Sequence, residues 1–125
     1  MAKIIIVEDE QILLKALSIQ LLSANFVVLT ASNGEAGLDL IKKEKPDAVL
    51  LDILMPKMNG FEVLEALKKD ESTKNIPVIV LSNQASEEEQ KKGLGLGAAD
   101  YYVKSSTDLG DLTAKVQSVL DKNKK

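Results

Sequence analysis

The chain contains no cysteine and no histidine among its 125 residues. Without cysteine, neither a disulfide framework nor a thiolate metal site can form. Without histidine, the chain lacks the commonest general base of enzymes and the commonest zinc ligand. Tryptophan is also absent, and aromatic residues make up only 3% of the sequence, which leaves little to sandwich a flat ring system such as a flavin.

The sequence also lacks a strong charge of one sign and a long hydrophobic run. Its formal net charge is −3, and lysines are interspersed with acids, so we expect no direct binding of nucleic acid. No apolar stretch is long enough to span a membrane, and a strand-like run follows Met1-Ala2-Lys3 directly, without room for a signal peptide. We therefore expect a cytoplasmic protein, with residues 1–125 forming one domain and residues 122–125 a frayed tail.

Short apolar runs alternate with amphipathic segments along the whole chain. Strands are predicted at about 4–7, 26–29, 48–51, 78–81 and 99–103. Helices are predicted at about 11–23, from Asn33 to about Lys45, after Gly60, from Ser86 and from Asp108. On the first helix Leu13, Leu17 and Leu21 share one stripe, and on the third Phe61, Leu64 and Leu67 share one face.

Strands that alternate with helices favour a parallel sheet with right-handed crossovers. Strands buried on both faces of such a sheet are continuous apolar runs, and the runs at 4–7, 48–51 and 78–81 fit that description. The sequence therefore predicts a doubly wound α/β domain.

Polar residues follow four of the predicted strands. Glu8 and Asp9 follow the first, Asp52 the third, Ser82 the fourth and Lys104 the fifth. Ligands of open α/β sheets bind at the carboxyl ends of the strands, so these five side chains are expected to share one edge of the sheet. Each residue by itself is an ordinary turn, cap or surface residue. Their convergence on one edge is the observation that indicates a functional site.

Three carboxylates brought together repel one another, and a hard divalent cation is the simplest way to offset this repulsion. Mg²⁺ prefers oxygen ligands and is often bound by one or two carboxylates together with a phosphate. Phosphoryl transfer depends mainly on positioning and on electrostatic stabilisation. Lys104 and Ser82 are suited to contact phosphoryl oxygens, the first as a point charge and the second as a hydrogen-bond donor.

Four motifs give the chain a resemblance to the response regulator receiver domain family, and together they extend over nearly its whole length. They are IIVEDE, PDAVLLDILMPKMNG, PVIVLS and GAADYYVK, at residues 5–10, 46–60, 77–82 and 97–104. The resemblance implies a flavodoxin-like (βα)5 three-layer sandwich with strand order 2-1-3-4-5. It also implies a phosphorylation switch, which catalyses its own phosphorylation and slow hydrolysis but turns over no external product.

The resemblance assigns a role to each matching residue of the acidic group. Asp52 resembles the phosphoacceptor. Asp9, with Glu8 acting through water, resembles the acidic pair that holds Mg²⁺, and the backbone carbonyl of Leu54 is expected to complete the metal site.

Ser82 resembles the switch hydroxyl, Lys104 the phosphate-binding lysine, and Tyr101 an aromatic residue that changes rotamer on activation. The expected phosphoryl donor is a sensor histidine kinase or a histidine phosphotransfer protein. The expected output is a change in the surface formed by the fourth helix, the fifth strand and the last helix, which contacts a downstream protein or domain or forms a homodimer.

The sequence departs from the family pattern at four places. The acidic pair begins with Glu8 rather than Asp, which is a common variant. Ser105 follows the lysine where the family usually has a proline, often after a cis bond, and a cis bond to a non-proline residue costs about 3–4 kcal/mol. Asn83 is larger than the small residue usual after the switch position. Gly93, Gly95 and Gly97 fall near the end of the fourth helix, where an interior glycine costs about 1 kcal/mol against alanine.

The same fold hosts other functions, so alternatives need separate evidence. A flavodoxin needs a hydroxyl-rich and glycine-rich loop after the first strand, but residues 8–10 are all acidic. A phosphatase of the haloacid dehalogenase type needs a second Asp two residues after its nucleophile, but Gln11 stands two residues after Asp9. A pseudo-receiver, which keeps the fold as a protein-interaction module without phosphorylation, is the alternative that remains.

Overall fold

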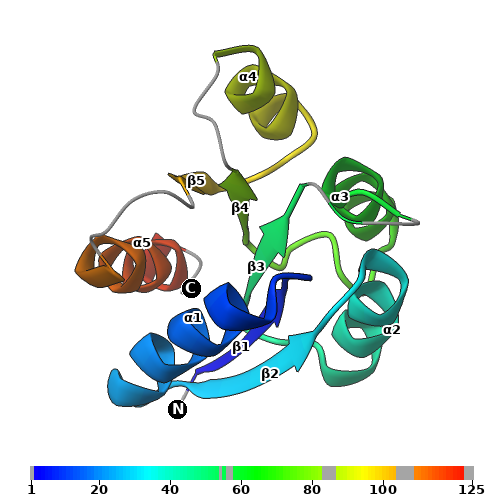
Figure 1. The fold of residues 1–125 in the computed structure, drawn as a ribbon. Helices are drawn as coiled ribbons and strands as arrows, with labels where there is room; N and C mark the ends of the chain where they lie inside the picture. Colours follow the sequence, from blue (N-terminus) through cyan, green and yellow to red (C-terminus); the bar gives the residue numbers. More distant parts are fainter. Residues whose placement is uncertain (1, 54, 56–57, 83–86, 104–108, 123–125) are drawn as a thin grey trace.

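The computed structural model describes residues 2–53, 55, 58–82, 87–103 and 109–122 (Figure 1). One parallel sheet of five strands runs through the middle of the molecule, in the order β2-β1-β3-β4-β5. The strands are β1 (Lys3–Val7), β2 (Val27–Ala31), β3 (Ala48–Asp52), β4 (Val78–Ser82) and β5 (Asp100–Val103). The helices are α1 (Gln11–Ser23), α2 (Gly34–Glu44), α3 (Gly60–Lys69), α4 (Glu87–Gly95) and α5 (Leu109–Lys122). The predicted doubly wound fold and strand order are confirmed.

Helices cover both faces of the sheet, so the strands carry two hydrophobic cores. In Figure 1, α1 and α5 lie on one face and α2 and α3 on the other. Successive residues of a strand point to opposite faces, so Ile4 and Ile6 join the core under α1 and α5, whereas Ile5 and Val7 join the core under α2 and α3. This double burial explains why β1, β3 and β4 are continuous apolar runs.

The helices bury slightly different stripes from those predicted. On α1 the buried residues are Leu14, Leu17 and Leu21, and Leu13 is only partly buried at the margin of the core. On α3 the buried face includes Val63 with Leu64 and Leu67, whereas Phe61 is partly buried. Both differences are small rotations of the helix about its axis, which the two-sided packing of the sheet determines.

Some predicted boundaries also shift. The second strand covers Val27–Ala31 rather than 26–29, and the fifth begins at Asp100 rather than at residue 99. The predicted cap at Asn33 is confirmed, because its side chain accepts a hydrogen bond from the Ala36 amide. The predicted caps Ser86 and Asp108 lie outside the described residues, as do residues 123–125 of the predicted tail; Lys122 ends α5.

The glycines near the end of α4 are not equivalent. The helix continues through Gly93 and ends at Gly95, while Gly97 lies beyond it with a φ of +106°. A residue in that left-handed conformation belongs to a turn, so the cost of a glycine within a helix can apply only to Gly93 and Gly95.

Candidate functional site

Three acidic side chains meet at the carboxyl ends of β1 and β3. Each of Glu8, Asp9 and Asp52 offers one carboxylate oxygen, and these oxygens all lie within 4.8 Å of one another. The meeting follows from the sheet: Val7 pairs with Leu51, so the residues after Val7 and Leu51 leave neighbouring strands at the same level. The convergence predicted from the sequence is confirmed for these three residues.

Two of the three carboxylates are almost completely removed from solvent. Glu8 is 0% exposed and Asp52 is 1% exposed, whereas Asp9 is half-buried. The Glu10 amide donates a hydrogen bond of 3.0 Å to Glu8 Oε2. Glu8 Oε1 and Asp52 Oδ2 are buried and accept no hydrogen bond from the described part of the chain. A buried carboxylate oxygen in such a position is costly unless a cation or another donor satisfies it.

The donor set fits a hard divalent cation. All three groups are carboxylates, one oxygen of each lies within 4.8 Å of the others, and Glu8 and Asp52 are buried. Oxygen ligands of this kind suit Mg²⁺ or Ca²⁺ and are a poor match for zinc, which favours nitrogen and sulfur. The residues present therefore fit the metal that the sequence analysis implied.

Gly60 closes the loop that follows Asp52, a role that sequence reasoning did not identify. Its amide donates a hydrogen bond of 2.9 Å to the Ile53 carbonyl. A Cβ at this position would overlap the Asp52 carbonyl oxygen and would lie 2.7 Å from the Ile53 Cα. The next helix is held by a capping box between Asn59 and Glu62. Only glycine allows α3 to begin this close to the backbone of Asp52.

The other predicted site residues follow neighbouring strands. Asp52 pairs with Leu81 on β4, and Ser82 pairs with Val103 on β5, so the strand ends at 52, 82 and 103 lie side by side. The side chain of Ser82 lies outside the described residues, and so do Leu54, Asn83, Lys104 and Ser105, including the bond between the last two.

Tyr101 lies on β5, where it pairs with Val80. Its ring is partly buried against the core under α2 and α3, and its hydroxyl donates a hydrogen bond to the Gln90 carbonyl on α4. The predicted switch aromatic is therefore in contact with the backbone of the helix that the sequence analysis connected to it.

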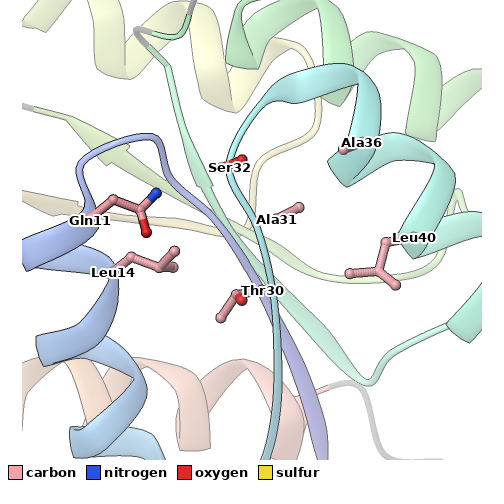
Figure 2. Close-up of a pocket in the computed structure, with 7 residues that line it drawn as sticks. All are labelled: Gln11, Leu14, Thr30, Ala31, Ser32, Ala36 and Leu40. Atoms are coloured by element: carbon pink, nitrogen blue, oxygen red, sulfur yellow. The ribbon is translucent and has the colours of Figure 1, made fainter.

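Two surface hollows lie away from the acidic cluster. One has a volume of about 500 Å³ and lies beside the carboxyl end of the edge strand β2, between α1 and α2. Figure 2 shows Gln11 and Leu14 on one side of it and Ala36 and Leu40 on the other. The second, of about 450 Å³, follows β5 between α4 and α5 and includes Leu94, Tyr101 and Lys115. Neither hollow is lined by Glu8, Asp9 or Asp52.

No helix in the described ranges is long and apolar enough to cross a membrane.

Comparison with solved structures gives close agreement in fold. The chemotaxis protein CheY4 of Vibrio cholerae superposes with a TM-score of 0.89 at 30% identity, over 95% of this chain and 98% of that one. The receiver domain of the Francisella response regulator 1452 superposes with a TM-score of 0.91 at 26% identity, over 99% and 100% of the two chains.

Sequence comparison leads to the same group of proteins. Protein PilH of Pseudomonas aeruginosa is 41% identical over 104 residues, which are 83% of this chain and 86% of PilH. The protein named probable transcriptional regulator ycf27 of Guillardia theta is 38% identical over 98% of this chain, but that match is only 47% of the relative, so the chain spans about half the length of such regulators. The family model of the response regulator receiver domain matches residues 4–117. The chain belongs to the response regulator receiver domain family.

Proposed function

We propose that the chain is the phosphoacceptor switch of a two-component phosphorelay and that Asp52 receives the phosphoryl group. The observation that carries this proposal is the buried cluster of Glu8, Asp9 and Asp52 at the carboxyl ends of β1 and β3. Of the three, Asp52 ends the central strand whose residues are all buried. Its carboxylate is held rigidly by that strand, as a nucleophile in an in-line transfer needs to be.

In the proposed reaction, an oxygen of Asp52 forms a bond to phosphorus while the bond from phosphorus to the donor imidazole nitrogen breaks. The electron pair of the broken bond stays with that nitrogen. The donor is a phosphohistidine of a sensor histidine kinase or of a histidine phosphotransfer protein, as the family membership implies. The product is an acyl phosphate, which water later hydrolyses, so the domain modifies only itself and turns over no external product.

In this scheme Asp9 and Asp52 would ligate Mg²⁺ directly, Glu8 would act through water, and the carbonyl of Leu54 would complete the site. When bound, the metal neutralises charge that develops on the phosphoryl oxygens. The chain's own contribution is to hold one oxygen from each of three carboxylates within 4.8 Å of the others before the metal binds. The deep burial of Glu8 and Asp52 supports this assignment, because a cation beside them would offset the cost of burying their charges.

Lys104 and Ser82 are proposed to contact two phosphoryl oxygens. The pairing of Asp52 with Leu81 and of Ser82 with Val103 supports this, because it brings the strand ends that carry these residues together. An ammonium group and a hydroxyl would then replace the water that solvates the phosphoryl oxygens. Movement of Ser82 toward the phosphoryl group is the proposed first step of signalling.

The proposed output is a change in the surface formed by α4, β5 and α5, which would contact a downstream protein or domain or a second copy of the chain. Tyr101 lies on β5 within this surface. The proposed location is the cytoplasm, where a kinase-linked relay operates, and neither nucleic acid nor membrane is a proposed partner of this domain.

Incubation with acetyl phosphate and Mg²⁺, followed by intact mass measurement, tests the proposal. We expect the addition of one phosphoryl group to the wild type and none to Asp52→Asn, which keeps the size of the side chain and removes the nucleophilic charge. Equal labelling of both proteins would show that the acceptor is elsewhere. Failure of the wild type both to accept the group and to bind beryllium fluoride with Mg²⁺ would favour the pseudo-receiver.

A further inference from the structure

Helix α4 has an unusual attachment to the rest of the molecule. None of the α4 residues whose side chains are described belongs to either hydrophobic core, and the one large apolar side chain of the helix, Leu94, is 53% exposed. Among the α4 positions whose burial is described, only Gly93 is buried. A helix normally attaches through a buried apolar stripe, and for α4 the described residues provide none.

The backbone of α4 is instead held by a side chain from β5. The Tyr101 hydroxyl donates to the Gln90 carbonyl, and the end of the ring occupies the space that a side chain at position 93 would need. A Cβ on Gly93 would lie 2.5 Å from the Tyr101 Oη and 3.2 Å from its Cζ. Real Cβ atoms do not approach other atoms as closely as the first of these distances. The missing side chain therefore forms a notch that admits the tyrosine.

A second contact joins α4 to α3 at the same place. The Lys92 ammonium lies 4.6 Å from the centre of the Phe61 ring, a cation–π arrangement. The Cε1 atom of that ring would be 3.7 Å from a Cβ on Gly93, which is ordinary contact. The tyrosine hydroxyl, the edge of Phe61 and the glycine thus meet at one point.

We propose that Gly93 is a positioning residue that fastens α4 to the sheet through Tyr101. Departure of the tyrosine from the notch breaks its hydrogen bond to α4, and movement of α4 away from β5 breaks the same contact, so the two motions are coupled. The link to signalling rests on the proposed function: Tyr101 pairs with Val80, two residues before Ser82 on β4. A movement near Ser82 would then reach α4 through a single side chain.

The chain contains a matched control for this idea. Gly95 lies in the same helix two residues later, and a Cβ there would meet nothing within 4 Å. Alanine has a higher helix propensity than glycine at both positions, although the gain at Gly95, the last residue of α4, is the smaller one. Helix propensity alone therefore predicts that both substitutions make α4 more stable, whereas the notch predicts opposite effects.

Amide hydrogen exchange of the whole chain, without Mg²⁺ or phosphoryl donor, measures these effects in α4. We expect Gly95→Ala to slow exchange in α4 or leave it unchanged. Gly93→Ala should accelerate it about tenfold, because the added methyl group overpacks the notch. Exchange in β1 and β3 is the reference for global stability and should change little. If Gly93→Ala slows exchange in α4 as Gly95→Ala does, the proposal is wrong.

Two further variants keep the test decisive even if Gly93→Ala folds poorly. Tyr101→Phe retains the ring and removes the hydrogen bond, and it should accelerate exchange in α4 about threefold to tenfold. In the background of Tyr101→Ala, which empties the notch, adding Gly93→Ala should no longer accelerate exchange. An equal acceleration with and without the tyrosine would refute the coupling.

Failure of this inference can be told apart from failure of the proposed function. If Asp52 is labelled normally while Gly93→Ala, Tyr101→Phe and Tyr101→Ala all leave exchange in α4 unchanged, the attachment of α4 through Gly93 is wrong and the phosphoacceptor role stands. If the exchange pattern is as expected but Asp52 is not labelled, Gly93 and Tyr101 attach α4 to the sheet for structural reasons only, and the proposed switch is wrong.

Discussion

Replacing Asp52 with asparagine removes one of three clustered charges while nearly preserving the size of the side chain. One carboxylate oxygen of each residue in the cluster lies within 4.8 Å of the others, and two full charges at that distance repel by about 3.5 kcal/mol at an effective dielectric constant of about 20. Neighbouring dipoles and cations relax around the charges and reduce this figure. We expect Asp52→Asn to raise the free energy of unfolding of the metal-free protein by about 1–3 kcal/mol.

The stabilisation of the folded protein by Mg²⁺, in contrast, should require the Asp52 carboxylate. A ligand that binds only the folded protein stabilises it by about 1.4 kcal/mol when its concentration is ten times the dissociation constant. For a domain of this size, such a gain raises the melting temperature by about 4–7 °C. The wild type should show this increase, and Asp52→Asn should show little or none, because the cluster has lost one of its ligands.

The assay is thermal and urea unfolding of both proteins at neutral pH, with and without Mg²⁺. Asp39→Asn is the matched control, since it makes the same chemical change at an exposed position on α2 outside the cluster. Its effect should stay within about 0.5 kcal/mol in both conditions. The electrostatic account of the site fails if Asp52→Asn destabilises the metal-free protein, or if Mg²⁺ stabilises that variant as strongly as the wild type.

Three further predictions concern the same edge of the sheet. In Mg²⁺ titrations followed by calorimetry, Asp9→Ala should lose far more affinity than Glu8→Ala, and equal losses would contradict the proposed division into a direct ligand and one acting through water. Leu54→Asn should shorten the lifetime of the phosphorylated protein, because in this family the position flanks the path of the attacking water and a leucine cannot orient it; an unchanged or longer lifetime in a hydrolysis time course would contradict this. Gly60→Ala should lower the free energy of unfolding by about 1–3 kcal/mol or more and slow labelling of Asp52 by acetyl phosphate, because the added Cβ would overlap the Asp52 carbonyl; labelling at the wild-type rate would show that the loop tolerates the displacement.

Much of the fold could be predicted from the local sequence pattern, because strands that are buried on both faces of a sheet are recognisable as continuous apolar runs. Runs such as Ile4 to Val7 are apolar without interruption, since each residue faces one of two cores. The acidic cluster could be predicted for a related reason: in a parallel sheet, residues that follow neighbouring strands must come together. That reasoning needs the strand ends and their adjacency, but no side-chain detail.

Features that depend on a distant partner could not be predicted in this way. The second strand continues through Thr30 and Ala31 because its pairing with β1 extends to Val7, which periodicity within the strand does not reveal. Likewise, Leu14 rather than Leu13 completes the buried stripe of α1, because packing against the sheet and α5 determines the rotation of the helix.

The two glycines of α4 show most clearly the difference between what the local sequence predicts and what contacts with distant residues determine. In the sequence, Gly93 and Gly95 are the same residue in the same helix, and both predict only a weaker helix. In the folded chain, one lies against the Tyr101 hydroxyl and the other against open space. The sequence by itself determined the parallel sheet, its order of elements and the gathering of carboxylates at one edge, because these follow from the local alternation of apolar and polar residues. Only the tertiary structure decided how deeply Glu8 and Asp52 are buried, why position 60 must be glycine, and which of two glycines admits the tyrosine, because each depends on contacts between residues that are far apart in the chain or lie on different elements.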